Sequence, residues 1–216
     1  MKLVGLLDSP YVRRVAISLQ LLDVRFEHQP LSVFAGFEAF RAINPVVKAP
    51  TLVLDEGEML VDSSLILQYA EAIAGSGRSL MPPDLAGQRQ ALRIIGLALT
   101  ANEKSVQLVY ERKLRPADKQ HAPWIDRVTG QLLAAYDALD AAFRDAPRPS
   151  QSQTIDQAGI TTAVAWMFSR MMVPDVIAAT AYPSLQNFSE RAEALLEFKA
   201  APFGSTAYRH PDGAAT

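Results

Sequence analysis

The chain has 216 residues, of which 49% are hydrophobic and 20% charged, a composition ordinary for a soluble globular protein of one or two domains. Its formal net charge is -2 and its 21 lysines and arginines are scattered, which argues against a nucleic-acid-binding surface. The absence of cysteine excludes disulfides, cysteine metal sites and a cysteine nucleophile.

Two further classes of protein are disfavoured by the pattern of residues. The three histidines, His28, His121 and His210, are far apart and show no HxxxH or HExxH spacing, so we expect no metal site. No stretch approaches 18 uncharged apolar residues, and the N-terminal run MKLVGLL is too short for a signal-peptide core. We therefore expect no membrane segment and a cytoplasmic location.

The first 75 residues alternate short apolar runs with helical patterns. Residues 2–7 have the length of a strand and end at a turn in which Ser9 is a candidate helix N-cap and Pro10 the first helical position. The helix that follows is expected to end near Asp23. Further strands are predicted over residues 24–29, 51–54 and 59–61, and further helices over 37–42 and after Asp62-Ser63-Ser64. This order indicates an α/β domain with one small mixed sheet.

The character of the chain changes after a stretch rich in Gly, Ser and Pro. We assign residues 1–76 to the α/β domain, 77–87 to a linker and 88–203 to an all-α domain. Helices are predicted over 88–113, 124–145 and 183–200, with an apolar central helix behind a capping box formed by Thr154 at N-cap and Gln157 at N3. The tail 204–216 is expected to be disordered.

Three short motifs in the first domain could carry chemistry. Ser9 adds a hydroxyl to the N-terminus of a helix, where backbone N–H groups favour an anion. Pro50 directly precedes a strand, and a cis bond there would present the backbone of Ala49 outward. Asp62 and Ser63 form a second helix N-terminus, suited to an ammonium and a carboxylate. Taken singly, each motif is better explained by a cap or a turn.

Together the motifs SPYVR at 9–13, NPVVKAPTL at 44–52 and Asp62-Ser63 resemble the glutathione-binding domain of glutathione S-transferases. The resemblance covers residues 1 to about 200 and includes the helical second half. It implies a thioredoxin-like N-terminal domain (βαβαββα) followed by an all-helical C-terminal domain. It also implies glutathione as co-substrate, a small electrophilic second substrate and a homodimer.

The resemblance further implies a role for each matching residue. Ser9 corresponds to the catalytic hydroxyl of the serine-type members. Ala49, before a cis-Pro50, pairs its backbone with the cysteinyl part of glutathione. Asp62 holds the γ-glutamyl amine and Ser63 its carboxylate, while Lys48 reaches the glycyl carboxylate.

The expected activity is thiol transfer, with Ser9 donating a hydrogen bond to the glutathione sulfur. Such a bond and a helix N-terminus can lower a thiol pKa by about one to two units. Arg13, one helical turn past Ser9, is expected to be a solvated or dimer-contacting charge, with electrostatic support of the site as the alternative. The alternatives are a binding or regulatory protein without turnover, or a peroxidase, lyase or isomerase using the same site. The electrophile pocket is expected between the domains, although core packing also explains each of its candidates: Tyr11, Asn102, Val106, Tyr110 and Trp166.

Overall fold

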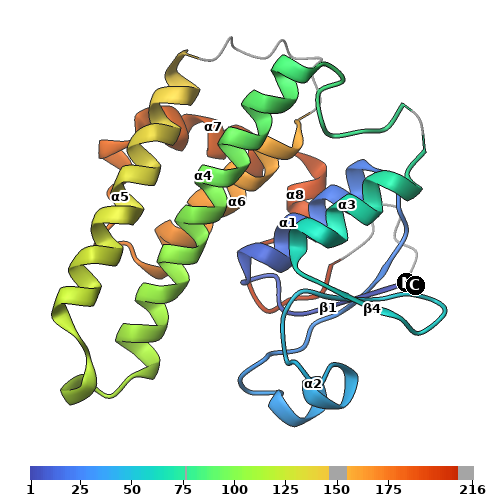
Figure 1. The fold of residues 1–216 in the computed structure, drawn as a ribbon, viewed down its shortest axis with the longest axis horizontal. Coiled ribbons are helices and arrows are strands. Elements are labelled where there is room, and N and C mark those ends of the chain that lie inside the picture. The colour runs from blue at the N-terminus through green and yellow to red at the C-terminus, as the bar shows by residue number, and fades with distance from the viewer. Residues whose placement is uncertain (76, 146–154, 209–216) are drawn as a thin grey trace. The chain divides into compact units, whose positions relative to one another are not determined.

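The computed structural model describes residues 1–75, 77–145 and 155–208 (Figure 1). The chain divides into two compact units. The first contains Met1–Leu80 together with a later stretch that begins at Ala194, and the second contains Met81–Glu193. The predicted helical domain, 88–203, differs from this division because the stretch from Ala194 groups with the first unit.

Four short strands form the sheet of the first unit: β1 (Lys2–Val4), β2 (Glu27–Gln29), β3 (Thr51–Val53) and β4 (Met59–Val61). Their order is β2-β1-β3-β4, with β1 parallel to β2 and antiparallel to β3, and β3 antiparallel to β4. This mixed sheet confirms the predicted thioredoxin-like domain. β2 begins three residues later than predicted, because the chain is still closing the preceding helix when the Val24 N–H bonds to the Leu19 carbonyl.

Helices α1 (Pro10–Leu21) and α3 (Ser63–Ile73) lie on one side of this sheet, and α2 (Phe37–Ile43) lies on the other (Figure 1). The core between them is apolar and fully buried, since its side chains are 0% exposed; it includes Leu3, Val4, Val15, Leu19, Leu52 and Ile66. Burial of this kind stabilises the folded state by roughly 25 cal/mol per Å² of apolar surface removed from water. The core therefore holds α1, and the turn that precedes it, in a fixed place on the sheet.

The C-terminal helix α8 (Leu196–Ala200) returns to pack on α1, which explains why its segment groups with the first unit. Phe198 is fully buried, and the Arg13 guanidinium lies 5.5 Å from the centre of its ring. The Arg13 Nε also donates to the Ala201 carbonyl at 2.8 Å. The expectation that Arg13 is solvated or contacts a second subunit is therefore wrong: its side chain is buried because α8 covers it.

The segment after α8 is anchored as far as Tyr208, instead of the disorder predicted from Gly204. The Tyr208 ring stacks on Phe26 with centroids 4.6 Å apart, and its N–H donates to His28 Nδ1 at 2.9 Å. His28 Nε2 in turn donates to the Gly5 carbonyl at 2.8 Å. These bonds fix His28 as the neutral tautomer with its proton on Nε2. Residues 209–216 lie outside the described part of the chain.

His28 is expected to make stability depend on pH in the acid range. Burial lowers its pKa from 6.5, and protonation at Nδ1 removes the acceptor for Tyr208. The hydrogen bond from Tyr208 to His28 contributes about 0.5–1.5 kcal/mol to the free energy of unfolding. This stabilisation is fully present above pH 6.5 and is lost as the pH falls through the lowered folded-state pKa of His28. Thermal unfolding at a series of pH values measures this loss. His28→Gln, which cannot titrate, should show a flatter profile, and parallel profiles would contradict the assignment.

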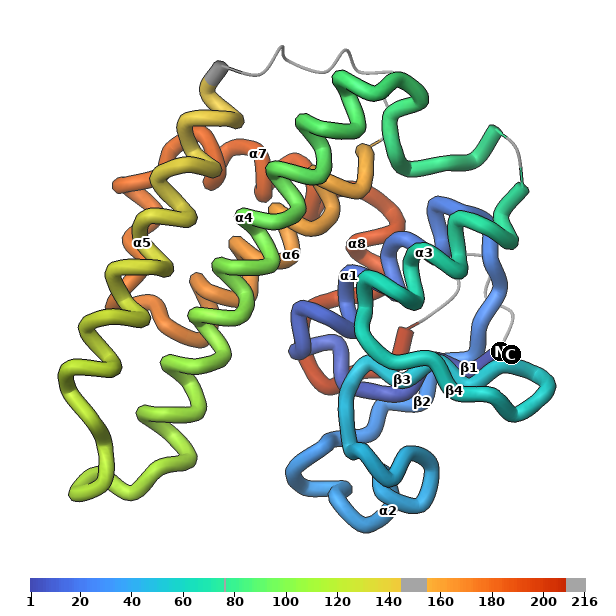
Figure 2. Tube along the Cα trace, in the orientation of Figure 1, coloured from blue at the N-terminus to red at the C-terminus, as the bar shows by residue number. Residues whose placement is uncertain are grey.

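In its described part, the second unit contains four long helices: α4 (Leu85–Val109), α5 (Ala122–Asp145), α6 (Gln157–Met172) and α7 (Pro183–Glu193), seen in Figure 2. A π-helical turn (Tyr110–Leu114) and a 3-10 turn (Ala117–Lys119) follow α4, and another 3-10 turn (Ala179–Ala181) precedes α7. The helix predicted over 183–200 is divided into α7 and α8, because Leu195 adopts an extended backbone. The core shared by these helices includes Ala98, Leu108, Leu132, Tyr136, Ala165 and Leu185.

Helix α6 is buried nearly all round, as predicted for a central helix, but its cap differs from the predicted one. Asp156 is the N-cap, and its Oδ1 accepts from the Gly159 N–H at 2.7 Å. Gln157 is the first helical residue rather than N3, and Thr154 lies outside the described residues. A carboxylate at N-cap satisfies a free N–H of the first turn and complements the helix dipole. None of the helices in the described part of the chain has the length and apolar character needed to cross a bilayer.

Candidate functional site

The sheet register brings the three sequence motifs to one edge of the first unit. Thr51 pairs with Val4 on one side and with Val61 on the other, so these three residues form one row across the sheet. Beyond this row, β1 leads into the Ser9 turn, β3 has just left Pro50, and β4 leads into Asp62. The close approach at Gly5 supports this placement, because a Cβ built there would lie 3.2 Å from the Ala49 Cβ. The motifs, distant in sequence, are therefore neighbours at one edge.

Ser9 is the N-cap of α1, as predicted, with an extended backbone (φ -71°, ψ 122°) and Pro10 directly inside the helix. Its Oγ accepts from the Val12 N–H at 3.5 Å, a long and therefore weak bond. Accepting this bond uses a lone pair of the hydroxyl and leaves its proton available for donation. The half-buried Ser9 thus offers a donor at the positive end of a helix.

The loop before β3 is held from within by two buried polar side chains. Asn44 Nδ2 donates to Thr51 Oγ1 at 2.8 Å, and Thr51 Oγ1 donates to the Lys48 carbonyl at 2.7 Å. The Ala49–Pro50 peptide bond is cis. Pro50 is buried, Ala49 is half-buried, and Lys48 is exposed. Sequence reasoning used the motif but missed the anchoring role of Asn44 and Thr51, whose polar character inside the motif was the available signal.

Asp62 caps α3 from an unusual backbone conformation. Its φ is 68°, and its Oδ1 accepts from the Ser64 N–H at 2.9 Å. A positive φ is uncommon for residues other than glycine, although Asp and Asn tolerate it best. Asp62 is exposed, so its second carboxylate oxygen can accept from a ligand. The adjacent Ser63 is 2% exposed, and its hydroxyl faces a neighbour on α1.

That neighbour is Arg14, which sequence reasoning did not identify. Its Nη1 lies 3.1 Å from Ser63 Oγ and 3.2 Å from Ser64 Oγ, and the residue is 2% exposed. Burial lowers the pKa of Arg14 to about 10, an effect that the charge of Asp62 opposes, so the guanidinium is still cationic at neutral pH. Arg14 therefore ties the N-terminus of α3 to α1 and places a positive charge behind it. Since it donates to the hydroxyls, their own protons stay available to a ligand.

Removing the Arg14 side chain should destabilise the protein more than removing any exposed arginine. Arg14→Ala leaves a cavity and two hydroxyls without their donor, so we expect a loss of about 2–4 kcal/mol in the free energy of unfolding. Arg41→Ala is the matched control, because Arg41 is exposed and its contacts, with Glu38 and with the Phe37 ring, lie on the surface. Denaturant unfolding compares the two variants. Equal stability of Arg14→Ala and Arg41→Ala would show that the buried guanidinium does not hold the turn.

The five residues predicted to line an electrophile pocket fall in both units. Tyr11 is half-buried in the first, and the other four are in the second. Trp166 is 2% exposed and donates to Gln186 Oε1 at 3.1 Å, so core packing accounts for it. Asn102 is fully buried on α4, and neither its Oδ1 nor its Nδ2 has a hydrogen-bond partner among the described residues. The last two of the five predicted residues are the half-buried Val106 and the exposed Tyr110, and partial burial raises the pKa of Tyr110. The electrophile pocket itself stays a prediction.

Comparison with known proteins relates the chain to one family. Residues 3–79 match the family model for the N-terminal domain of glutathione S-transferase. The chain is 27% identical over 174 residues to an Escherichia coli protein described as uncharacterized GST-like protein YibF, covering 81% of this chain and 85% of that one. It is 30% identical over 138 residues to a maleylacetoacetate isomerase of Pseudomonas aeruginosa, covering 61% and 64%. These matches make the chain similar in sequence to glutathione S-transferases.

Solved structures of this family have the same fold. The glutathione S-transferase of Methylobacterium radiotolerans, in complex with glutathione sulfonate, superposes with a TM-score of 0.81 at 25% identity and covers 95% of this chain and 96% of its own. A family member from Pseudomonas fluorescens with bound glutathione gives a TM-score of 0.79 at 27% identity, covering 93% and 97%. Within the described residues, no three His, Asp or Glu side chains are grouped in a way that could hold a metal ion.

Proposed function

We propose that this protein binds glutathione at the edge site and activates its thiol through Ser9 for attack on an electrophilic small molecule. The single observation that carries the proposal is the sheet register, which places the Ser9 turn, Ala49–Pro50 and Asp62–Ser63 beside one another. The Ser9 turn offers a donor for an anion, the cis Ala49–Pro50 segment offers backbone groups, and Asp62 and Ser63 offer partners for an amine and a carboxylate. A peptide with a thiol, an amine and carboxylates matches all three.

Each part of glutathione has a counterpart in this site. The backbone of Ala49 can pair with the cysteinyl residue as one strand pairs with another. Asp62 can accept from the γ-glutamyl amine, while the Ser63 hydroxyl and the first N–H groups of α3 can hold the γ-glutamyl carboxylate, with the Arg14 charge behind them. The exposed Lys48 can supply a positive charge to the glycyl carboxylate. The bound tripeptide would then direct its thiol toward Ser9.

The chemistry follows from the pKa of the thiol. A free thiol has a pKa of about 8.5, so only a minority is thiolate at neutral pH. A hydrogen bond to a charged group contributes about 1.5–3 kcal/mol, and each pKa unit requires about 1.4 kcal/mol. The Ser9 O–H donates to the sulfur and stays protonated, while the thiol proton passes to solvent. The thiolate then forms a bond to the electrophilic carbon, and the leaving group departs with the electron pair of the broken bond.

A second activity, glutathione-dependent isomerisation, is favoured by the 30% sequence identity to the Pseudomonas aeruginosa isomerase. The same thiolate could add to a carbon–carbon double bond conjugated with a carbonyl group. Rotation about the resulting single bond and expulsion of the thiolate would return glutathione unchanged. Peroxidase or lyase chemistry, and binding without turnover, would use the same site. The homodimer and the cytoplasmic location stay predictions.

Calorimetric titration with glutathione, paired with turnover assays, tests the proposal. We expect saturable binding, and turnover with a nitro-activated aryl chloride, a cis-enone diacid or both. Turnover of the diacid alone would select the isomerase, whereas binding without turnover of any electrophile would select the regulatory alternative. If glutathione does not bind, the proposal is wrong.

A further inference from the structure

Gly5 lies where two parts of the edge site approach each other. Its φ is 141°, and a Cβ built on it would lie 2.5 Å from a methyl group of Val12 and 3.2 Å from the Ala49 Cβ. Val12 supplies the N–H that the Ser9 Oγ accepts, and Ala49 supplies the backbone proposed to pair with glutathione. The position of the Gly5 backbone therefore affects both the Ser9 turn and the Ala49 segment.

The backbone groups of Gly5 are both bonded to β2, but in different ways. The Gly5 N–H donates to the Gln29 carbonyl at 3.1 Å, which continues the main-chain pairing of β1 with β2. The Gly5 carbonyl instead accepts from a side chain, the His28 Nε2, at 2.8 Å. The next carbonyl, that of Leu6, accepts from the Ser9 N–H at 3.1 Å. One imidazole thus orients the first peptide group of the turn that leads to Ser9.

The C-terminal segment determines which nitrogen of His28 carries the proton. The Tyr208 N–H donates to Nδ1 at 2.9 Å, so Nδ1 is an acceptor and Nε2 is the donor. Burial lowers the pKa of His28 from 6.5, so the ring is neutral at neutral pH. Tyr208 is itself held by stacking on Phe26, with ring centroids 4.6 Å apart. The segment therefore keeps the imidazole in the tautomer that donates to Gly5.

We propose that His28 is a positioning residue for thiol activation and that the C-terminal segment acts on it through Tyr208. The Nε2–H of His28 fixes the Gly5 carbonyl, and Gly5 in turn sets the approach of the Ser9 turn to Ala49. This role rests on the proposed function, because its effect is to present the Ser9 hydroxyl to the glutathione sulfur. His28 acts through Gly5, and no contact with glutathione is required of it.

Two variants of His28 separate its contact with Gly5 from its contact with Tyr208. In His28→Gln the side-chain amide can take the place of Nε2 and still donate to Gly5, whereas the shorter amide of His28→Asn takes the place of Nδ1. We expect His28→Asn to lower kcat/KM for glutathione transfer about 2- to 12-fold, the effect of one lost hydrogen bond. It should also raise the pH at which the bound thiol is half-ionised. His28→Gln should recover most of both losses.

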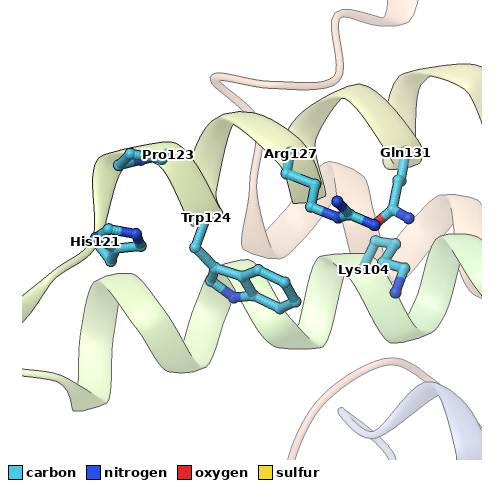
Figure 3. A pocket seen from close by; sticks show the side chains of 6 residues that line it. All are labelled: Lys104, His121, Pro123, Trp124, Arg127 and Gln131. Carbon is cyan, nitrogen blue, oxygen red and sulfur yellow. The ribbon is translucent and has the colours of Figure 1, made fainter.

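A matched control makes the same change elsewhere in the chain. His121 is exposed and lines a groove of the second unit near the start of α5 (Figure 3). His121→Asn should leave kcat/KM and the thiol midpoint unchanged, with all variants measured at a temperature where they are folded. Equal losses in His28→Asn and His28→Gln would overturn the role of the Gly5 contact. A native protein that does not bind glutathione would overturn the proposed function and this role together, whereas native-like turnover by His28→Asn would overturn this role alone.

Nuclear magnetic resonance of the free protein tests the link to the C-terminal segment without glutathione. Imidazole ¹⁵N spectra, assigned with His28→Asn, should show His28 as a neutral ring with its proton on Nε2. Tyr208→Ala removes the stacked ring but keeps the N–H, whereas Tyr208→Pro removes both. Only Tyr208→Pro should move part of the proton to Nδ1. A proton on Nδ1 in the native protein, or the same spectrum for both Tyr208 variants, would overturn the link.

Discussion

Replacing Ser9 by alanine is expected to reduce kcat/KM for glutathione transfer by about 10- to 100-fold. The variant loses one hydrogen bond to a charged sulfur, which contributes about 1.5–3 kcal/mol. The glutathione Kd should change much less, because Ala49, Asp62 and Ser63 still hold the peptide. The midpoint of the pH profile of kcat/KM should rise by about one to two pH units, since the thiol ionises less readily. Steady-state kinetics over a pH series measures both effects.

Two further variants separate the donor role of Ser9 from its role as a helix cap. Ser9→Thr keeps both the hydroxyl and the cap, and should recover most of the activity. Ser9→Gly keeps an acceptable N-cap at a cost of a few tenths of a kcal/mol but has no hydroxyl, so it should be as impaired as Ser9→Ala. If Ser9→Gly is instead as active as the native protein, the hydroxyl is not the thiolate donor.

Replacing Asp62 by asparagine is expected to weaken glutathione binding by about 10- to 100-fold, while kcat at saturation changes little. The variant loses the charge-assisted bond to the γ-glutamyl amine, again about 1.5–3 kcal/mol. Asparagine tolerates a positive φ and can still accept from the Ser64 N–H, so the turn and the N-terminus of α3 should be preserved. Calorimetric titration measures the Kd, and thermal unfolding checks that the fold is unchanged.

A glutathione analogue without the α-amino group provides the matched control. The native protein should bind it more weakly than glutathione, and Asp62→Asn should bind it as the native protein does. The double-mutant cycle then isolates the pairing of Asp62 with the amine. Equal losses for the analogue and for glutathione would mean that Asp62 acts only through the shape of its turn.

The order of elements in the first unit was predictable because its signals are local. Ser9 and Asp62 are short polar residues directly before apolar helical runs, and the structure finds both as N-caps. The second unit was less accurately predicted at its boundaries. Thr154 and Gln157, three residues apart, match a capping box and so predict Thr154 as the cap of α6, whereas the carboxylate of Asp156 caps the helix instead.

What the sequence could not show depends on contacts between distant segments. Arg13 and Arg14 look like surface charges on a helix, yet α8 covers one and α3 covers the other, at sequence separations of 188 and 49 residues. The anchoring of Tyr208 on Phe26 and His28 spans 180 residues and has no local signal. The three edge motifs could be matched to a family from sequence, but their adjacency follows only from the register of β1, β3 and β4.

The most direct test of the central role given to Ser9 is the ultraviolet absorbance of the glutathione thiolate, measured on the bound peptide across a pH series. For the native protein, the bound thiol should be half-ionised about one to two units below 8.5, the pKa of the free thiol. For Ser9→Ala, with glutathione still saturating, the midpoint should return toward 8.5. The same midpoint in both proteins would contradict the assignment of Ser9 as the thiolate donor.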